Sequence, residues 1–230
     1  MPSSAQGADK PRQPVPVWDL PVRVFHWLLV VLILFSWYSG KAGGNLMQYH
    51  MWSGYAILTL VLFRILWGFV GSYYARFDNF LHGPARGWWY GMSLLRNSAP
   101  PYLGHNPLGG LMVVLLLLCL LIQAGTGLFS NDDIVTDGPL VKWISKDTSD
   151  LLSRVHWLNF NLLLGLAAVH ILAVFYYLLV RKENLIGPMF TGVKQSAQQQ
   201  THAVQVTSTW VAVLLMAIIG LGVYVLVTWK

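Results

Sequence analysis

The chain has 230 residues, of which 55% are hydrophobic and only 10% are charged. A soluble domain carries roughly a quarter charged residues, so this composition indicates an integral membrane protein. The formal net charge is +6, but the sequence has no run of basic residues, so this charge does not indicate binding to nucleic acid. The single cysteine, Cys119, excludes a disulfide framework, a cluster of thiolate ligands and covalent haem attachment through a CxxCH motif.

The chain begins with a proline-rich polar segment, and we expect residues 1–17 to form a disordered cytoplasmic tail. Apolar stretches follow at about 22–39, 51–71, 108–129, 153–180 and 208–229. Each is near the roughly 20 residues that cross a bilayer as a helix. The predicted fold is therefore all-α: a transmembrane four-helix bundle over 18–194, a linker over 195–206 and a fifth C-terminal transmembrane helix within 207–230.

Two connecting segments have the composition of membrane surfaces. The segment 72–106 contains Trp88, Trp89 and Tyr90, which favours an interfacial helix. The segment 131–150 is rich in aspartate. With a cytoplasmic N-terminus, ten Lys and Arg residues lie on the cytoplasmic side and five outside. Because positive charge gathers on the cytoplasmic side, we expect the N-terminus inside and the aspartate-rich segment outside.

Four of the seven histidines fall within or at the ends of the predicted spans: His26, His50, His156 and His170. An ionisable residue at membrane depth indicates function by default. A single interfacial histidine is more often a hydrogen-bonded residue at a helix end than a ligand. Four histidines at two depths favour ligands.

The spacing of these histidines favours two cofactors. His156 and His170 are 14 residues apart, which places them ~40° from in phase and ~21 Å apart along one helix. That distance is too long for one metal ion and suits two stacked cofactors. The outer pair is then His50 with His156, and the inner pair is His26 with His170, as bis-imidazole ligation of two non-covalent haems requires. Counted from the inner helix ends, the inner pair differs in depth by ~12 Å, which helix tilt or a projecting fourth helix would absorb.

An arginine lies close to two of these histidines. Arg23 precedes His26 by three residues, and Arg154 precedes His156 by two. The planar guanidinium suits carboxylates, so each is a candidate partner of a haem propionate; the alternative is an interfacial anchor. Small residues that would let a flat porphyrin approach the helices are Gly54, Gly125, Gly127 and Gly165.

The chain resembles the bacterial cytochrome b561 family, which includes the b-type cytochrome subunits of membrane-bound nickel–iron hydrogenases. The resemblance covers roughly residues 17–194 and rests on the helix that carries His156 and His170 together with four motifs. These motifs are VWDLPVRVFHW at 17–27, HMWSGY at 50–55, FRILWGFVG at 63–71 and NLIGPMFTG at 184–192.

The resemblance implies a four-helix core with two b haems in the bacterial inner membrane, and its four ligand positions match the four histidines of the predicted pairs. It also implies exchange of electrons with membrane quinone and with a periplasmic redox protein, either a c-type cytochrome or a hydrogenase-like subunit. We therefore expect an electron-transfer protein of a respiratory chain. A homodimer stays open.

Three other functions stay open. A self-standing superoxide:quinone oxidoreductase would need no partner, but the acidic outer segment does not favour an anionic substrate. A transporter with proton-relay histidines or a membrane assembly factor would contain no haem, and the purified protein would be colourless.

Overall fold

The computed structural model describes residues 13–133, 136–196 and 205–229. Five long helices are present in this part of the chain, and each is long and apolar enough to cross a membrane. They are α1 (Leu20–Ala42), α2 (Met47–Val70), α5 (Pro107–Gly127), α6 (Lys146–Leu179) and α8 (Thr209–Thr228). The predicted all-α membrane fold is confirmed.

Shorter elements connect the long helices. They are β1 (Gln13–Pro16), η1 (Gly44–Leu46), η2 (Tyr73–Ala75), α3 (Phe77–Phe80), α4 (Gly83–Leu95), η3 (Val141–Trp143), α7 (Ile186–Thr191) and β2 (Val193–Ser196).

Polar side chains cap the starts of the long helices other than α2. The side chains of Asp19, Asn106, Ser145 and Ser208 accept hydrogen bonds from backbone N–H groups in the first turns of α1, α5, α6 and α8. These N–H groups have no partner within the helix, so the caps fix where each helix begins.

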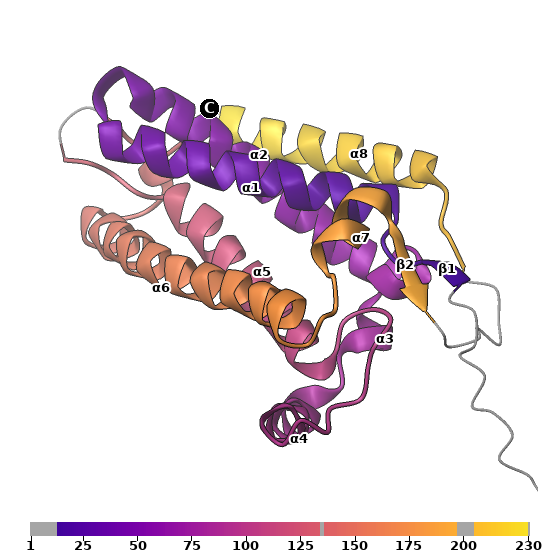
Figure 1. Cartoon of the computed structure of the whole chain (residues 1–230). Helices are drawn as coiled ribbons and strands as arrows, with labels where there is room; N and C mark the ends of the chain where they lie inside the picture. Colours follow the sequence, from indigo (N-terminus) through magenta and orange to yellow (C-terminus); the bar gives the residue numbers. More distant parts are fainter. Residues whose placement is uncertain (1–12, 134–135, 197–204, 230) are drawn as a thin grey trace, which may run out of the picture.

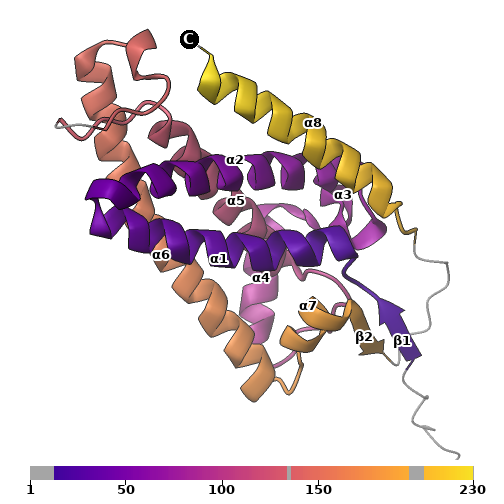
Figure 2. The same ribbon diagram turned by 90° about the horizontal axis from the view of Figure 1, so that it is seen from above.

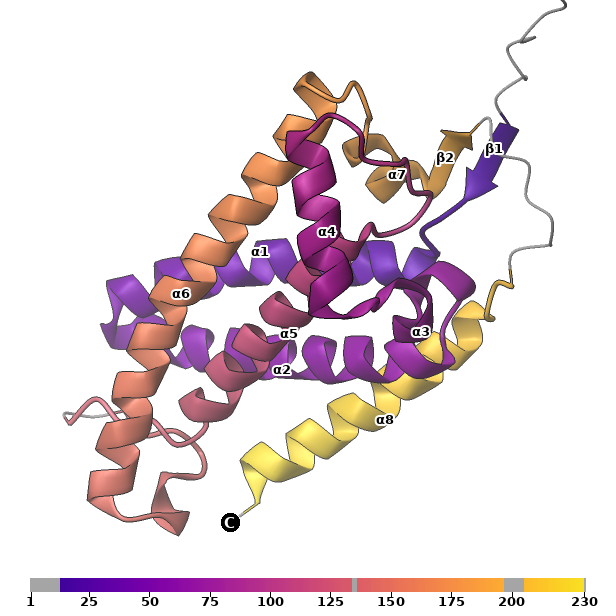
Figure 3. The same cartoon turned by 90° about the horizontal axis from the view of Figure 1, so that it is seen from below.

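The long helices form two layers. In Figure 1, α1, α2 and α8 lie above α5 and α6, and α4 runs across their direction at one end. Figure 2 shows α8 diverging from α2, and Figure 3 shows α6 crossing α1 and α2 obliquely. Helix α2 packs against α1, α5 and α8 and supplies the most deeply buried large side chains, Val61, Phe63 and Trp67. It is the central helix of the bundle.

The bundle has two chemically different ends. The strand end, named for β1 and β2, also contains α3, α4 and α7 (Figure 1). The loop end contains the connection between α5 and α6, residues 128–145. Helix α8 runs from the strand end, where Thr207 N donates to Ser72 Oγ at 3.0 Å, to the loop end, where Lys142 Nζ donates to Trp229 O at 3.4 Å.

The start of the described chain is ordered against a later segment. β1 pairs with β2 antiparallel, with Gln13 opposite Ser196 and Pro16 opposite Val193, and Val15 and Val17 are buried. This differs from the disordered tail expected over residues 1–17 and from a linker starting at 195. Burial of the two valines explains the difference at 13–17, while residues 1–12 and 197–204 lie outside the described part.

Helix α6 extends beyond the membrane core. Its 34 residues span ~51 Å, whereas the hydrocarbon core of a bilayer is ~30 Å thick. Near its C-terminal end, the hydroxyl of Tyr177 lies 3.0 Å from that of Tyr90 on α4. Arg181, just after α6, donates to Asn97 and to the carbonyl of Ala99. The C-terminal end of α6, the fourth membrane helix, therefore projects beyond the membrane core and contacts α4.

Candidate functional site

The rings of His50 and His156 face each other at the loop end. His50 lies in the first turn of α2 and His156 lies in α6, and their ring centroids are 6.1 Å apart with an interplanar angle of 81°. We call them the loop-end pair; they are the outer pair expected from the sequence.

Each ring of the loop-end pair is oriented by a backbone carbonyl. His50 Nδ1 lies 2.8 Å from Ser36 O, and His156 Nδ1 lies 2.9 Å from Gln123 O. A carbonyl only accepts, so in both neutral rings the proton lies on Nδ1 and the lone pair lies on Nε2. Histidines that bind metals have this arrangement, in which the second nitrogen donates to a carbonyl and fixes the tautomer.

The rings of His26 and His170 face each other closer to the strand end. His26 lies in α1 and His170 in α6, and their ring centroids are 6.5 Å apart with an interplanar angle of 57°. We call them the strand-end pair; they are the expected inner pair. His26 Nδ1 is buried and has no hydrogen-bond partner. The depth mismatch estimated from the sequence is absorbed by the projection of α6.

Both pairs fit a metal ion held between two imidazoles. A metal–nitrogen bond of about 2 Å on each side, plus about 1.1 Å from each nitrogen to its ring centre, gives about 6.2 Å between ring centroids. The observed 6.1 Å and 6.5 Å are close to this value. Within the described residues, no group of three or more His, Cys, Asp or Glu side chains is placed to hold a metal ion. Two-ligand sites of this kind suit a macrocycle that supplies the remaining ligands, as haem does.

The glycines divide into two groups. A Cβ atom at Gly54, Gly125 or Gly165 would meet no atom within 4 Å, so open space adjoins these positions. A Cβ at Gly127 would lie 3.0 Å from His156 Cε1, and one at Gly40 would lie 2.8 Å from His50 Nδ1. The first three positions leave room for a flat group, whereas Gly127 and Gly40 let the backbone approach the loop-end rings.

The two arginines expected beside the haems have different surroundings. Arg23 Nη1 donates to the carbonyl of Phe190 at 2.5 Å, and the nearby Trp27 Nε1 donates to Met189 O at 3.1 Å. Arg23 therefore connects α1 to the C-terminal end of α7, and its buried Nε has no partner. Arg154 is exposed on α6 near the loop-end pair.

Two further residues near the strand-end pair were not predicted as site residues. Arg64 in α2 is only 3% exposed, and its Nη1 has no hydrogen-bond partner. His105 packs its ring 4.6 Å from the rings of both Trp18 and Phe80, and its Nδ1 is also buried without a partner. Burial lowers the pKa of His105 to about 3, with the charges of Arg64 and His170 acting in the same direction. The signal in the sequence was an arginine inside an apolar span, which is costly unless it has a role.

The sequence model of the prokaryotic cytochrome b561 family matches residues 17–192. The chain belongs to this family. Membership implies haem b and electron transfer in a membrane. The match contains all four histidines of the two pairs and ends before α8.

Several relatives are similar over much of this family domain. A probable Ni/Fe-hydrogenase B-type cytochrome subunit of Rhizobium leguminosarum bv. viciae is 27% identical, over 79% of this chain and 89% of the relative. A protein of the same description from Bradyrhizobium diazoefficiens is 25% identical, over 80% of this chain and 87% of the relative. The probable Ni/Fe-hydrogenase 1 B-type cytochrome subunit of Escherichia coli K12 is 27% identical, over 50% of this chain and 60% of the relative. No solved structure matches the chain.

Proposed function

We propose that this protein is a di-haem cytochrome that carries electrons between membrane quinone and a periplasmic redox partner. The loop-end pair, His50 and His156, holds one haem b, and the strand-end pair, His26 and His170, holds the other. The observation that carries the proposal is the matching separation of the two pairs, 6.1 Å and 6.5 Å between ring centroids.

The chain contributes ligands, orientation and a low-dielectric environment, while each haem supplies a one-electron couple. Carbonyls of α1 and α5 hold the loop-end rings with Nε2 free, so both ligands are oriented before a haem binds. The two ligands on α6 are 14 residues apart, which separates the two sites by ~21 Å along that helix. Electrons therefore cross much of the bilayer within one chain.

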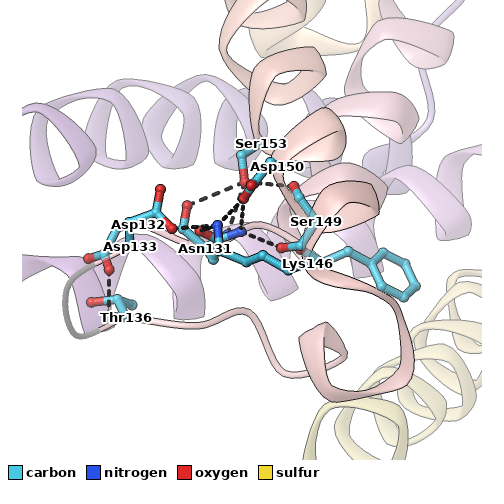
Figure 4. Close-up of polar contacts among 9 residues, drawn as sticks. Asn131, Asp132, Asp133, Thr136, Lys146, Ser149, Asp150 and Ser153 are labelled. Atoms are coloured by element: carbon cyan, nitrogen blue, oxygen red, sulfur yellow. Dashed lines mark hydrogen bonds and ion pairs between the residues drawn. The ribbon is translucent and has the colours of Figure 1, made fainter.

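The loop end is the proposed periplasmic side. The distribution of Lys and Arg favours a cytoplasmic strand end, and hence a bacterial inner-membrane protein whose N-terminus is inside. At the loop end, Asn131 Nδ2 donates to Ser149 Oγ and Asp150 Oδ1, while Lys146 forms ion pairs with Asp133 and Asp150 (Figure 4).

This network partly neutralises the acidic side chains that could attract a basic partner. Asp133 and Asp150 share the charge of Lys146, so they attract a basic partner less than their number suggests. Asp137 and Asp147 remain the acidic candidates for contact with a basic surface, where charge mainly raises the association rate. Because the relatives are named as hydrogenase subunits, a hydrogenase-like protein is the first partner to test; a c-type cytochrome is the second.

We place quinone exchange near the strand-end haem. Helix α4 lies across this end, with Trp88 and Trp89 about 70% exposed and Tyr90 buried against the bundle, as in a helix at a membrane surface. A quinone moving in the bilayer would meet the protein beside this helix. The superoxide:quinone oxidoreductase alternative has no comparable support, because the loop end presents acidic side chains to an anionic substrate.

The haem content of the purified chain tests this proposal. A pyridine haemochrome assay on protein extracted in mild detergent should give two haems b per chain, both removed by acid acetone because neither is covalent. A ratio near one would contradict the two-site assignment. Colourless protein from haem-replete cells would favour a transporter or an assembly factor instead.

A further inference from the structure

Arg64 is a buried cation without a hydrogen-bonded counter-ion. Its side chain is almost completely enclosed, its Cζ lies 5.5 Å from the centre of the Phe77 ring, and its Nη1 donates to nothing. Asp19 attracts it electrostatically, but no hydrogen bond joins the two side chains, and the carboxylate of Asp19 accepts from other donors. Oδ1 accepts from Val22 N and Oδ2 accepts from Trp67 Nε1, each at 2.9 Å.

A buried, unsatisfied guanidinium is strongly destabilising. Such a group in a folded protein implies a partner that joins the structure later. The partner must accept hydrogen bonds, and an anionic oxygen suits the planar fork of arginine best.

His105 points to the same missing partner. Its ring packs on Phe80, which contacts Phe77, the ring beside Arg64, and on Trp18, the neighbour of Asp19. The buried Nδ1 of His105 also has no partner. A neutral imidazole nitrogen can donate to a carboxylate. Two unsatisfied polar side chains from separate parts of the chain, α2 and the segment before α5, therefore adjoin one place beside the strand-end pair.

The depth of this place suits the edge of a haem. The Asp19–Trp67 hydrogen bond sets the two residues at one level of the antiparallel helices α1 and α2. From that level His26 lies seven residues along α1, or ~10 Å, and Arg64 lies three residues along α2, or ~4.5 Å. Arg64 is thus closer to the strand end than His26 is. A haem held by His26 with its carboxylates towards the strand end would bring them near Arg64.

We propose that Arg64, assisted by His105, binds a propionate carboxylate of the haem held by His26 and His170. This inference rests on the proposed function, because it requires a haem at the strand-end pair. It adds Arg64 to Arg23 as a propionate partner at this end; Arg23 donates to the carbonyl of Phe190 through Nη1, while its buried Nε has no partner.

The test compares Arg64→Gln with Arg86→Gln, which removes an exposed positive charge from α4 at the same end. Redox titration and low-frequency resonance Raman spectra are recorded on haem-loaded protein. Without Arg64 the ferric state of the strand-end haem gains stability, so its ratio of reduced to oxidised form should fall at least tenfold at a given potential. That is a decrease of about 59 mV in its midpoint potential. One propionate bending band should shift, and Arg86→Gln should change neither quantity.

Arg64→Lys keeps the positive charge but replaces the planar guanidinium with an ammonium group. This variant is used if Arg64→Gln does not assemble. It should shift the propionate band with a smaller change in potential. An unchanged band in the assembled variant would overturn the proposal, even if the potential falls, because Arg64 would then act only as a buried charge. An unchanged band with a raised KM for quinone would assign Arg64 to a quinone oxygen instead. Protein without haem would refute the proposed function itself, a result distinct from any of these.

Discussion

At the residue scale, the loop-end histidines, the proposed haem ligands, lie very close to the backbone of neighbouring helices. Nδ1 of His50 and of His156 each contact a carbonyl of a neighbouring helix, and this contact requires the helix backbone to approach the ring. Gly40 and Gly127 permit that approach, because a Cβ at either position would lie within 3.0 Å of a ring atom.

We therefore expect Gly40→Ala and Gly127→Ala to displace His50 and His156 and to weaken haem binding at the loop end. Overpacking of this kind costs about 1–3 kcal/mol. Haem per chain, measured by pyridine haemochrome, should fall towards one. Gly222→Ala is the matched control, since its Cβ would meet no atom within 4 Å. Full loading of both variants would show that these close contacts do not limit haem binding.

The sequence predicted which histidine rings lie close together, from the 14-residue spacing on one helix and the order of the spans. That they bind haem stays a prediction. It did not predict which atoms orient the rings. The carbonyls of Ser36 and Gln123 belong to the backbone and leave no signature in residue types. Arg64 was visible only as part of a motif, since its lack of a partner is a property of the folded neighbourhood.

At the element scale, the contact between α4 and α6 shows how a surface helix is fixed to the bundle. The hydroxyl of Tyr177 lies 3.0 Å from that of Tyr90 and accepts from Asn106 Nδ2 at 2.8 Å. Burial raises the pKa of Tyr90, so its hydroxyl stays protonated at neutral pH. This network connects α4, α5 and α6 next to the proposed quinone region.

Tyr177→Phe should reduce stability, because it removes the hydrogen bonds that join Tyr177 to Tyr90 and Asn106 and leaves Tyr90 only a long contact with the carbonyl of Pro100. The expected cost is about 1–3 kcal/mol, seen as a lower apparent Tm of the protein in detergent. Tyr176→Phe is the control, as Tyr176 is 38% exposed beside it. Equal melting temperatures for the two variants would mean that the network does not hold α4.

Helix α8 packs on α2 but carries none of the four histidines. A chain truncated after Ser196 should therefore retain two haems with unchanged absorption spectra, while its thermal stability decreases because the α2 surface under Ala212 and Val223 is exposed. The comparison is with the full-length chain, prepared in parallel. Loss of one haem on truncation would assign α8 a direct part in the haem sites.

The elements themselves were largely predictable, because apolar stretches of membrane length have few alternatives to a helix. The short strands were not. β1 contains two prolines and β2 lies in a polar segment, so neither has the alternating pattern of a strand, and their pairing depends on long-range contact.

At the scale of the whole molecule, the two sites are electrostatically unequal. Hydrogen bonds from Nδ1 to carbonyls make the loop-end imidazoles stronger donors, which would stabilise the ferric state of a haem bound there. At the strand end, His26 Nδ1 has no partner, and the buried charge of Arg64 would disfavour the ferric state of a haem bound there.

We thus expect the strand-end haem to have the higher midpoint potential, which makes electron flow from the loop end downhill. An optical redox titration should show two components, and the component lost in His50→Ala should be the one of lower potential. A higher potential for that component would reverse the predicted direction of flow.

The pairing of the histidines is the central claim, and the spectra of four single variants test it most directly. His50→Ala and His156→Ala should remove the same spectral and redox component, and His26→Ala and His170→Ala should remove the other. Only assembled protein is compared, because lost ligation also leaves a cavity in the bundle. If His26→Ala and His156→Ala removed the same component, the assignment of two haems to the loop-end and strand-end pairs would be contradicted.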